Sequence, residues 1–139
     1  MIIKEIRIRN FRSYYGDNNR FEFSDGLSII VGDNGDGKTT FFEAIQWLLN
    51  TMSDKASIEA ISEMRKSQME IGDEDVVSVS MVFDHDGEKS IEKTFAFSKT
   101  ANGFSLGKVQ YIGYESDGIQ RVNVNGKNLI ERCYDAFIQ

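Results

Sequence analysis

The sequence contains no proline, one histidine and one cysteine, Cys133, and no hydrophobic run approaches the roughly 18 residues that span a bilayer. A single cysteine excludes an internal disulfide and a cysteine-rich metal site, so packing must hold the fold. Without proline, sharp turns depend on the twelve glycines. No basic stretch followed by an apolar one opens the chain, so we expect a cytoplasmic protein that does not contact membranes.

Basic residues are fewer than acidic ones: the sequence contains 16 Lys and Arg and 22 Asp and Glu, which gives a net charge of -6. Non-specific affinity for DNA comes mostly from Lys and Arg that neutralise phosphates, so the chain as a whole is not a basic clamp. The charge is uneven, however. Residues 1–20 contain five bases and two acids, or +3, and the rest of the chain is -9. An anion-facing surface is therefore expected to start in this first segment.

The length of 139 residues and a hydrophobic fraction of 40% suit one core and exclude two domains. Alternating apolar and polar residues predict a strand over 1–12 and another over 21–23, joined by a polar turn at 17–19. The nearly unbroken apolar run 27–31 predicts a central strand covered on both faces. Helical spacing predicts a helix over 38–50, which completes a core of about residues 1–50.

The second part of the predicted single domain, about residues 51–139, has different hydrophobic patterns. A weaker helical pattern runs from Asp54, a candidate N-cap, to about 69. Alternating strands follow 72, and the last segment, 129–137, returns to helical spacing. Four turn-forming pairs tolerate positive φ and predict tight hairpins of a β-meander: Asp86-Gly87, Asn102-Gly103, Asp117-Gly118 and Asn125-Gly126.

One motif carries chemistry, and it lies between the predicted central strand and the predicted helix. It has a glycine, four further residues, a second glycine, a lysine and a threonine, which is the pattern of a phosphate-binding P-loop. In full it reads Gly32-Asp33-Asn34-Gly35-Asp36-Gly37-Lys38-Thr39. A glycine-rich turn without function is the alternative, but the complete pattern and both flanks favour the P-loop.

The residue types of this motif match the chemistry of ATP with Mg²⁺. Glycines at 32, 35 and 37 allow the main-chain amides between Val31 and Thr40 to curl around a phosphate tail. The helix that begins near Lys38 adds the positive end of its dipole. Lys38 is expected to reach the β- and γ-phosphates as the catalytic cation, and the Thr39 hydroxyl to bind Mg²⁺. Asp36 places a carboxylate in a loop built for anions, and it should weaken binding unless it points to solvent.

A second apolar run that ends in Asp84, followed by His85, Asp86 and Gly87, is similar to the metal-binding strand or switch of other P-loop enzymes. These residues also lie midway between two alternating runs, so a hairpin tip explains them without chemistry. We expect the hairpin. No Asn-Lys-x-Asp sequence is present, which argues against a GTPase.

Three stretches resemble the N-terminal part of the ATPase head of the structural-maintenance-of-chromosomes and RecF-like group, ABC-type ATPases of DNA repair and phage defence. The stretches are Ile6 to Tyr14, Gly26 to Gly35, and Gly37 to Thr40 with Glu43-Ala44-Ile45. The resemblance is specific over residues 1–50. It implies an α/β P-loop fold, namely the N-terminal lobe of an ABC-type head with an antiparallel β-meander.

The resemblance also implies roles for particular residues. Arg12, Ser13 and Asn34 would line the nucleotide, together with Gly32, Gly35, Asp36, Gly37, Lys38, Thr39 and Thr40 of the loop. Family heads have a glutamine that senses Mg²⁺ and the attacking water, and Gln139 is the candidate. The alternative for Arg12 is a solvated charge at a strand end.

Family heads need further groups that this sequence does not contain, namely a Leu-Ser-Gly-Gly-type signature, a metal-binding Asp and a catalytic Glu that follow a long coiled coil. The resemblance therefore implies a lobe that binds ATP and Mg²⁺ but hydrolyses ATP only when completed, as a head-to-head homodimer. DNA is the expected partner of the complete protein, with a nuclease or other effector subunit as a further candidate. A non-enzymatic interaction module with a vestigial loop is the alternative function, and a small-molecule kinase is a third.

Overall fold

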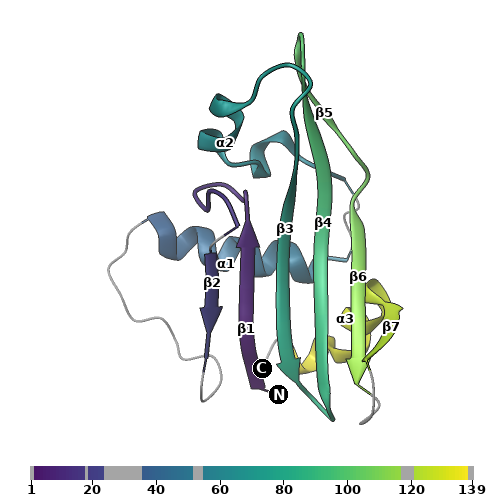
Figure 1. Ribbon diagram of the computed structural model, residues 1–139. Coiled ribbons are helices and arrows are strands. Elements are labelled where there is room, and N and C mark those ends of the chain that lie inside the picture. Colours follow the sequence, from purple (N-terminus) through teal and green to yellow (C-terminus); the bar gives the residue numbers. More distant parts are fainter. Residues whose placement is uncertain (1, 18, 24–35, 52–54, 117–120, 138–139) are drawn as a thin grey trace.

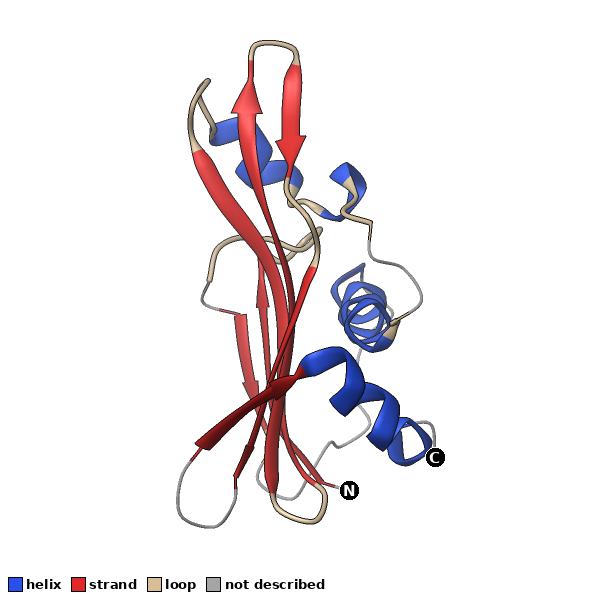
Figure 2. Ribbon diagram, turned by 90° about the vertical axis from the view of Figure 1, so that its right-hand side faces the viewer, coloured by secondary structure: helices blue, strands red, loops and turns tan. Residues whose placement is uncertain are grey.

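The computed structural model describes residues 2–17, 19–23, 36–51, 55–116 and 121–137. The described strands form one antiparallel sheet, and the helices α1 and α3 lie on one of its faces (Figures 1 and 2). The strands are β1 (Ile2–Arg9), β2 (Asn19–Glu22), β3 (Glu74–Asp84), β4 (Glu88–Thr100), β5 (Gly103–Leu106), β6 (Gln110–Ser116) and β7 (Arg121–Asn125). The helices are α1 (Asp36–Leu49), the short 3-10 helix η1 (Ile58–Ala60), α2 (Glu63–Gln68) and α3 (Gly126–Phe137).

The sheet runs in the order β2-β1-β3-β4-β6-β7, with β5 paired to the far end of β4. The predicted alternation of β1 is confirmed: Ile6 and Ile8 are buried under the helices, and Arg7 and Arg9 are exposed on the opposite face. The antiparallel pairing of β1 with β2 confirms the first predicted strand, turn and strand. The strand predicted over 27–31 lies outside the described residues.

The predicted helix over 38–50 is confirmed as α1. It crosses the helix-facing side of the sheet in Figure 1, and it buries Phe41, Ala44 and Leu48 against the strands. Phe41 packs edge-on against Phe21 of β2, with ring centroids 5.1 Å apart. The described parts of the chain therefore form a mixed α/β structure with α1 in its core. None of the described helices is long and apolar enough to cross a membrane.

The helix predicted over 54–69 is wrong as one continuous element. The chain instead forms η1 and α2, separated by Ile61, which is extended, and by Ser62, the N-cap of α2. Ile61 is buried, and its neighbours use their main-chain groups in bonds to another segment: Ser62 N–H donates to Asn10 O, and Ala60 O accepts from Arg12 N–H. These tertiary bonds replace helical ones. The candidate N-cap Asp54 lies outside the described residues.

Two of the four predicted hairpins are present. The β3–β4 hairpin turns at Asp86-Gly87, and the β4–β5 hairpin turns one residue earlier than predicted, at Ala101-Asn102, with Gly103 paired to Thr100. Both Asp86 and Gly87 have positive φ, 58° and 110°, as such a turn requires. The hairpin interpretation of Asp84 and its followers is thus confirmed. Asp117-Gly118 lies outside the described residues.

The hairpin predicted at Asn125-Gly126 is wrong, because α3 begins there. Asn125 Oδ1 accepts a hydrogen bond from Asn128 N–H, so this side chain caps the helix. Position 126 requires glycine because a side chain would collide with a neighbouring strand, and not because the chain turns there. A Cβ on Gly126 would lie 2.7–2.8 Å from main-chain atoms of Ile112, and one on Gly113 would lie 2.9 Å from Gly126 Cα. The start of α3 thus contacts β6 backbone to backbone.

We predict that Gly126→Ala lowers the free energy of unfolding by at least about 2 kcal/mol, because main-chain atoms of β6 would have to move. Chemical denaturation measures the loss. Val122→Ala in the adjoining strand is the control, since Val122 is 39% exposed and should change stability little. Equal effects of the two substitutions would contradict the close approach.

Candidate phosphate-binding site

The P-loop motif ends in the first turn of α1. Asp36, Gly37, Lys38, Thr39 and Thr40 form its first five residues, while Gly32, Asn34 and Gly35 lie outside the described residues. The first four N–H groups of a helix have no acceptor within it, and they carry the positive end of the helix dipole. The backbone donors at this end therefore suit a polyphosphate, in agreement with the residue types of the motif.

Asp36 is the first residue of α1. An acidic residue in the first turn of a helix interacts favourably with the helix dipole.

Arg12 lies against the same helix. Its Nη1 forms an ion pair with Oε2 of Glu43 at 2.5 Å, and this buried oxygen has no hydrogen-bond partner among the described residues. Glu43 is four residues beyond Thr39, or about 6 Å along the axis, and helical side chains lean toward the N-terminus. The side chain of Arg12 is 46% exposed. The arginine thus lies near the first turns of α1 and is accessible.

The conformation of Arg12 is unusual for a long side chain. Its φ is 50°, and Asn10 has a φ of 53°, both in the left-handed region that non-glycine residues seldom occupy. Between them, Phe11 is buried and packs on Trp47 of α1 with ring centroids 5.6 Å apart. Ser13 is exposed at the tip of the same turn. Strained residues of this kind persist only where their surroundings hold them.

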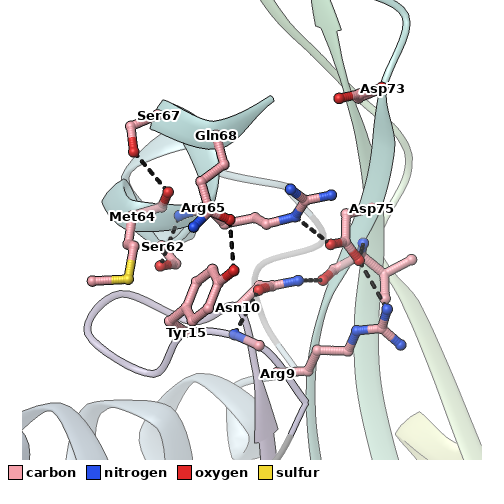
Figure 3. Close-up of polar contacts among 12 residues, drawn as sticks. Arg9, Asn10, Tyr15, Ser62, Met64, Arg65, Ser67, Gln68, Asp73 and Asp75 are labelled. Carbon is pink, nitrogen blue, oxygen red and sulfur yellow. Dashed lines mark hydrogen bonds and ion pairs between the residues drawn. The ribbon is translucent and has the colours of Figure 1, made fainter. Parts of the chain in front are cut away.

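Asn10 supplies much of that support (Figure 3). Its side chain is almost completely buried, donates to Val76 O of β3 at 3.0 Å and accepts from Gly16 N–H at 3.0 Å. Its main chain bonds to Gly16 O at 3.2 Å and to Ser62 N–H at 2.9 Å. One residue therefore holds both ends of the loop 10–16 to β3 and to the segment before α2. This residue was not among the predicted site residues, although asparagine after an alternating strand is a signal for a left-handed turn.

A charged cluster lies beside this loop. Asp75 at the start of β3 accepts from Arg9 at 3.0 Å and from Arg65 of α2 at 2.6 Å, and its side chain is only 12% exposed (Figure 3). Burial by itself raises the pKa of Asp75. The hydrogen bonds from Arg65 and from Val76 N–H, with the charges of Arg9 and Arg65, outweigh burial and hold this pKa below its ordinary value.

The basic segment 1–20 is largely neutralised by carboxylates. Each of its five bases has an acidic partner within 4.0 Å, contributed by β1, β2, β3, β4 or α1. Arg7 and Arg20 both contact Glu5. Burial raises the pKa of Glu5, but the hydrogen bonds and charges of these two arginines outweigh burial and hold that pKa below its ordinary value. These pairs tie the N-terminal strands together, and they do not favour the segment as a ready-made DNA contact.

Comparison with known proteins identifies the family. A family model described as an AAA domain matches residues 5–131, so the chain belongs to this family. Over 55 residues the chain is 36% identical to the chromosome partition protein Smc of Rhodopirellula baltica, a stretch that covers 40% of this chain and 4% of that protein. It is 47% identical over 55 residues to the DNA replication and repair protein RecF of Streptococcus uberis, covering 40% of this chain and 15% of the relative.

A third relative is the DNA double-strand break repair Rad50 ATPase of Methanocaldococcus jannaschii, 47% identical over 49 residues, or 35% of this chain and 5% of that protein. A solved structure from work on ATP-driven dimerization and DNA-stimulated activation of SMC ATPases covers 100% of this chain and 81% of its own, with a TM-score of 0.59 and 20% identity. That likeness shows the fold. The matches to these relatives span only a small part of their length, and together the findings confirm the resemblance to SMC-like and RecF-like ATPase heads.

The structure thus brings Arg12 to α1, whose first turn carries Lys38 and Thr39, while Gln139 lies outside the described residues. The roles of these residues stay predictions. Besides Asn10, the sequence did not single out Glu43 or Asp75 as part of the arrangement, since their partners are distant in the chain.

We predict that Asn10→Ala lowers the free energy of unfolding by about 2–4 kcal/mol, because it leaves buried Val76 O and Gly16 N–H without their partner and places alanine at positive φ. Urea denaturation measures the change. Asn19→Ala is the matched control, since Asn19 makes one exposed hydrogen bond, to Tyr15 O, and should cost much less. A loss no larger than that of the control would show that Asn10 does not support the loop.

We predict that stability falls with acidification partly through Asp75. Its native pKa is lowered, so the ionised carboxylate stabilises the fold above the unfolded value of about 3.9, and this stabilisation is lost as pH falls through the native pKa. Asp75→Asn should therefore be less stable than the wild type at pH 7, with the difference shrinking below pH 4. Denaturation from pH 7 to 2.5 measures it, with the exposed Asp73→Asn as control. A difference that is constant over this range would contradict the lowered pKa.

Proposed function

We propose that this chain is the ATP-binding and Mg²⁺-binding lobe of an SMC-like or RecF-like ATPase. In this proposal the main-chain amides of the P-loop hold the phosphates, with Lys38 on the β- and γ-phosphates and the Thr39 hydroxyl on Mg²⁺. Gly32, Asn34, Gly35, Gly37 and Thr40 line the same loop, and Arg12 and Ser13 approach from the loop 10–16. Membership of the AAA-domain family and the similarity to SMC, RecF and Rad50 proteins support the proposal.

The single observation that carries this proposal is the position of Arg12 against the helix that the P-loop motif begins. The exposed Arg12 contacts Glu43 in the middle of α1, the helix whose first turn carries the phosphate-loop lysine about thirty residues further along the chain. An arginine contributes five N–H donors in a planar fork, more than one carboxylate such as Glu43 can use. The donor set therefore fits a polyphosphate.

Hydrolysis is proposed to need groups from outside this sequence. Phosphoryl transfer depends on positioning and on electrostatic stabilisation, and a lobe without a carboxylate that orients water should bind ATP but hardly hydrolyse it. We propose that the complete protein supplies these groups and dimerises head to head, with two nucleotides at the interface. Gln139 is the proposed sensor of Mg²⁺ and water.

DNA is the proposed partner of the complete protein, in repair, chromosome maintenance or defence against phage. The names of the relatives support this proposal, since they are a chromosome partition protein, a DNA replication and repair protein and a DNA double-strand break repair ATPase. Because the bases of residues 1–20 are paired with carboxylates, we place the DNA contact elsewhere in the complete protein. A nuclease or other effector subunit is a further proposed partner.

We predict that the 139-residue chain binds ATP with Mg²⁺ and that Lys38→Ala weakens binding at least about tenfold, since a hydrogen-bonded charge pair contributes roughly 1.5–3 kcal/mol. Isothermal titration calorimetry measures the affinity, and an assay for released phosphate is expected to show almost no turnover. Lys55→Ala, at an exposed lysine outside the motif, is the matched control and should bind as the wild type does. Equal heats from wild type and Lys38→Ala would refute the phosphate-loop assignment.

A further inference from the structure

A lysine lies inside the core of the molecule, on the face of the sheet that the helices cover. Lys93 is in the middle of β4, between Val79 of β3 and Tyr111 of β6, and its residue is 1% exposed. Its neighbours on the same face of β4, Ile91 and Phe95, are buried and apolar. A buried cation costs free energy unless polar groups satisfy it, so its partners are informative.

Those partners lie at the C-terminal end of α1. The Nζ atom of Lys93 donates to Trp47 O at 2.9 Å and to Asn50 O at 3.0 Å. The hydroxyl of Tyr111 donates to the same Asn50 O at 2.9 Å. The ammonium also lies 4.7 Å from the ring centroid of Trp47 and 5.2 Å from that of Tyr111. Two strands thus hold the end of this helix by its main chain.

The helix itself explains why such a contact is useful. The last carbonyl groups of a helix have no partner within it, and they carry the negative end of the helix dipole. The last turn of α1 contains no basic residue of its own. Lys93 therefore supplies, from the sheet, the cation that a helix often carries in its last turn.

The middle of α1 is held by different contacts, namely Phe41 on Phe21 and Glu43 beside Arg12. A helix of 14 residues is a rod of about 20 Å, so a shift at one end is transmitted along the axis to the other. The first turn carries Lys38 and Thr39, and binding groups lose much of their effect when displaced by about 1 Å.

We propose that Lys93 is a positioning residue for the phosphate site: by holding the C-terminal carbonyls of α1, it sets the place of the first turn of α1 relative to Arg12. This inference rests on the proposed nucleotide binding. It adds to that function a residue of the β-meander, at the far end of the helix, which touches no phosphate and acts through α1.

The test compares the wild-type 139-residue chain with Lys93→Met, which keeps an unbranched apolar stem and removes the cation. Calorimetry with ATP and Mg²⁺ should show affinity reduced about tenfold, and titration with inorganic tripolyphosphate and Mg²⁺ should show a similar factor, because the first turn of α1 contacts phosphates. Tyr111→Phe keeps the ring and removes one donor to Asn50 O. It should weaken both ligands by a smaller factor, about threefold, with little change in thermal stability.

Phe97→Leu is the control for a general loss of stability. Phe97 is buried on the same face of the same strand, four residues or about 14 Å from Lys93, and its ring packs on Phe104 of β5. Thermal melts of every variant give the loss of stability. Phe97→Leu should lower the melting temperature and leave the affinity for both phosphate ligands within twofold of the wild type.

The outcomes separate this inference from the proposed function. If the wild type binds neither ATP nor tripolyphosphate, the proposed function fails. If the wild type binds and Lys38→Ala does not, while Lys93→Met binds within twofold of the wild type, only the positioning role is overturned. It is also overturned if Phe97→Leu weakens binding as much as Lys93→Met does. Should Lys93→Met not fold, an unchanged affinity of Tyr111→Phe would equally count against the role.

Discussion

The structure depends on how α1 is held. The N-terminal turn of this helix must stay open if its amides are to bind phosphate, so the sheet can hold the helix only by its flank and its C-terminal end. The apolar flank, Phe41, Ala44 and Leu48, packs into the core. The C-terminal end is bound by Lys93 and Tyr111 through main-chain carbonyls. The strands form the sheet that packs against this helix, η1 and α2 lie beside the loop 10–16, and α3 packs on β6.

The buried polar side chains follow from the same constraint. Asn10 and Lys93 are almost fully buried, and both bind main-chain groups of segments far along the chain. An apolar residue would pack at either position, but it could not satisfy the backbone of a left-handed loop or of a helix end. Apolar packing stabilises the contact between the sheet and the helices. These polar contacts determine where each segment lies within the layers.

Local patterns were sufficient for the elements and insufficient for their connections. Alternation predicted β1, and helical spacing predicted α1, because each pattern reports which face is buried. The helix predicted over 54–69 failed because Ala60 and Ser62 bond to the loop 10–16 instead of to their own helix. Gly126 was misread as a turn residue, since its role is a close contact with β6 that sequence spacing does not reveal. The motif and the resemblance led to the P-loop and Arg12 as predicted site residues, whereas Asn10, Asp75 and Lys93 each have at least one partner 43 to 66 residues away.

The two polar anchors, Asn10 and Lys93, together link the meander to the proposed phosphate site. Asn10 joins the loop that carries Arg12 to β3, and Lys93 joins the helix that carries Lys38 and Thr39 to β4. Strands β3 and β4 pair over eleven consecutive residue pairs, so they move as one unit. The loop that carries Arg12 and the helix that the P-loop begins are therefore both anchored to the same β3–β4 hairpin. In the proposed function, a phosphate bound between the arginine and the helix would therefore be coupled to this hairpin.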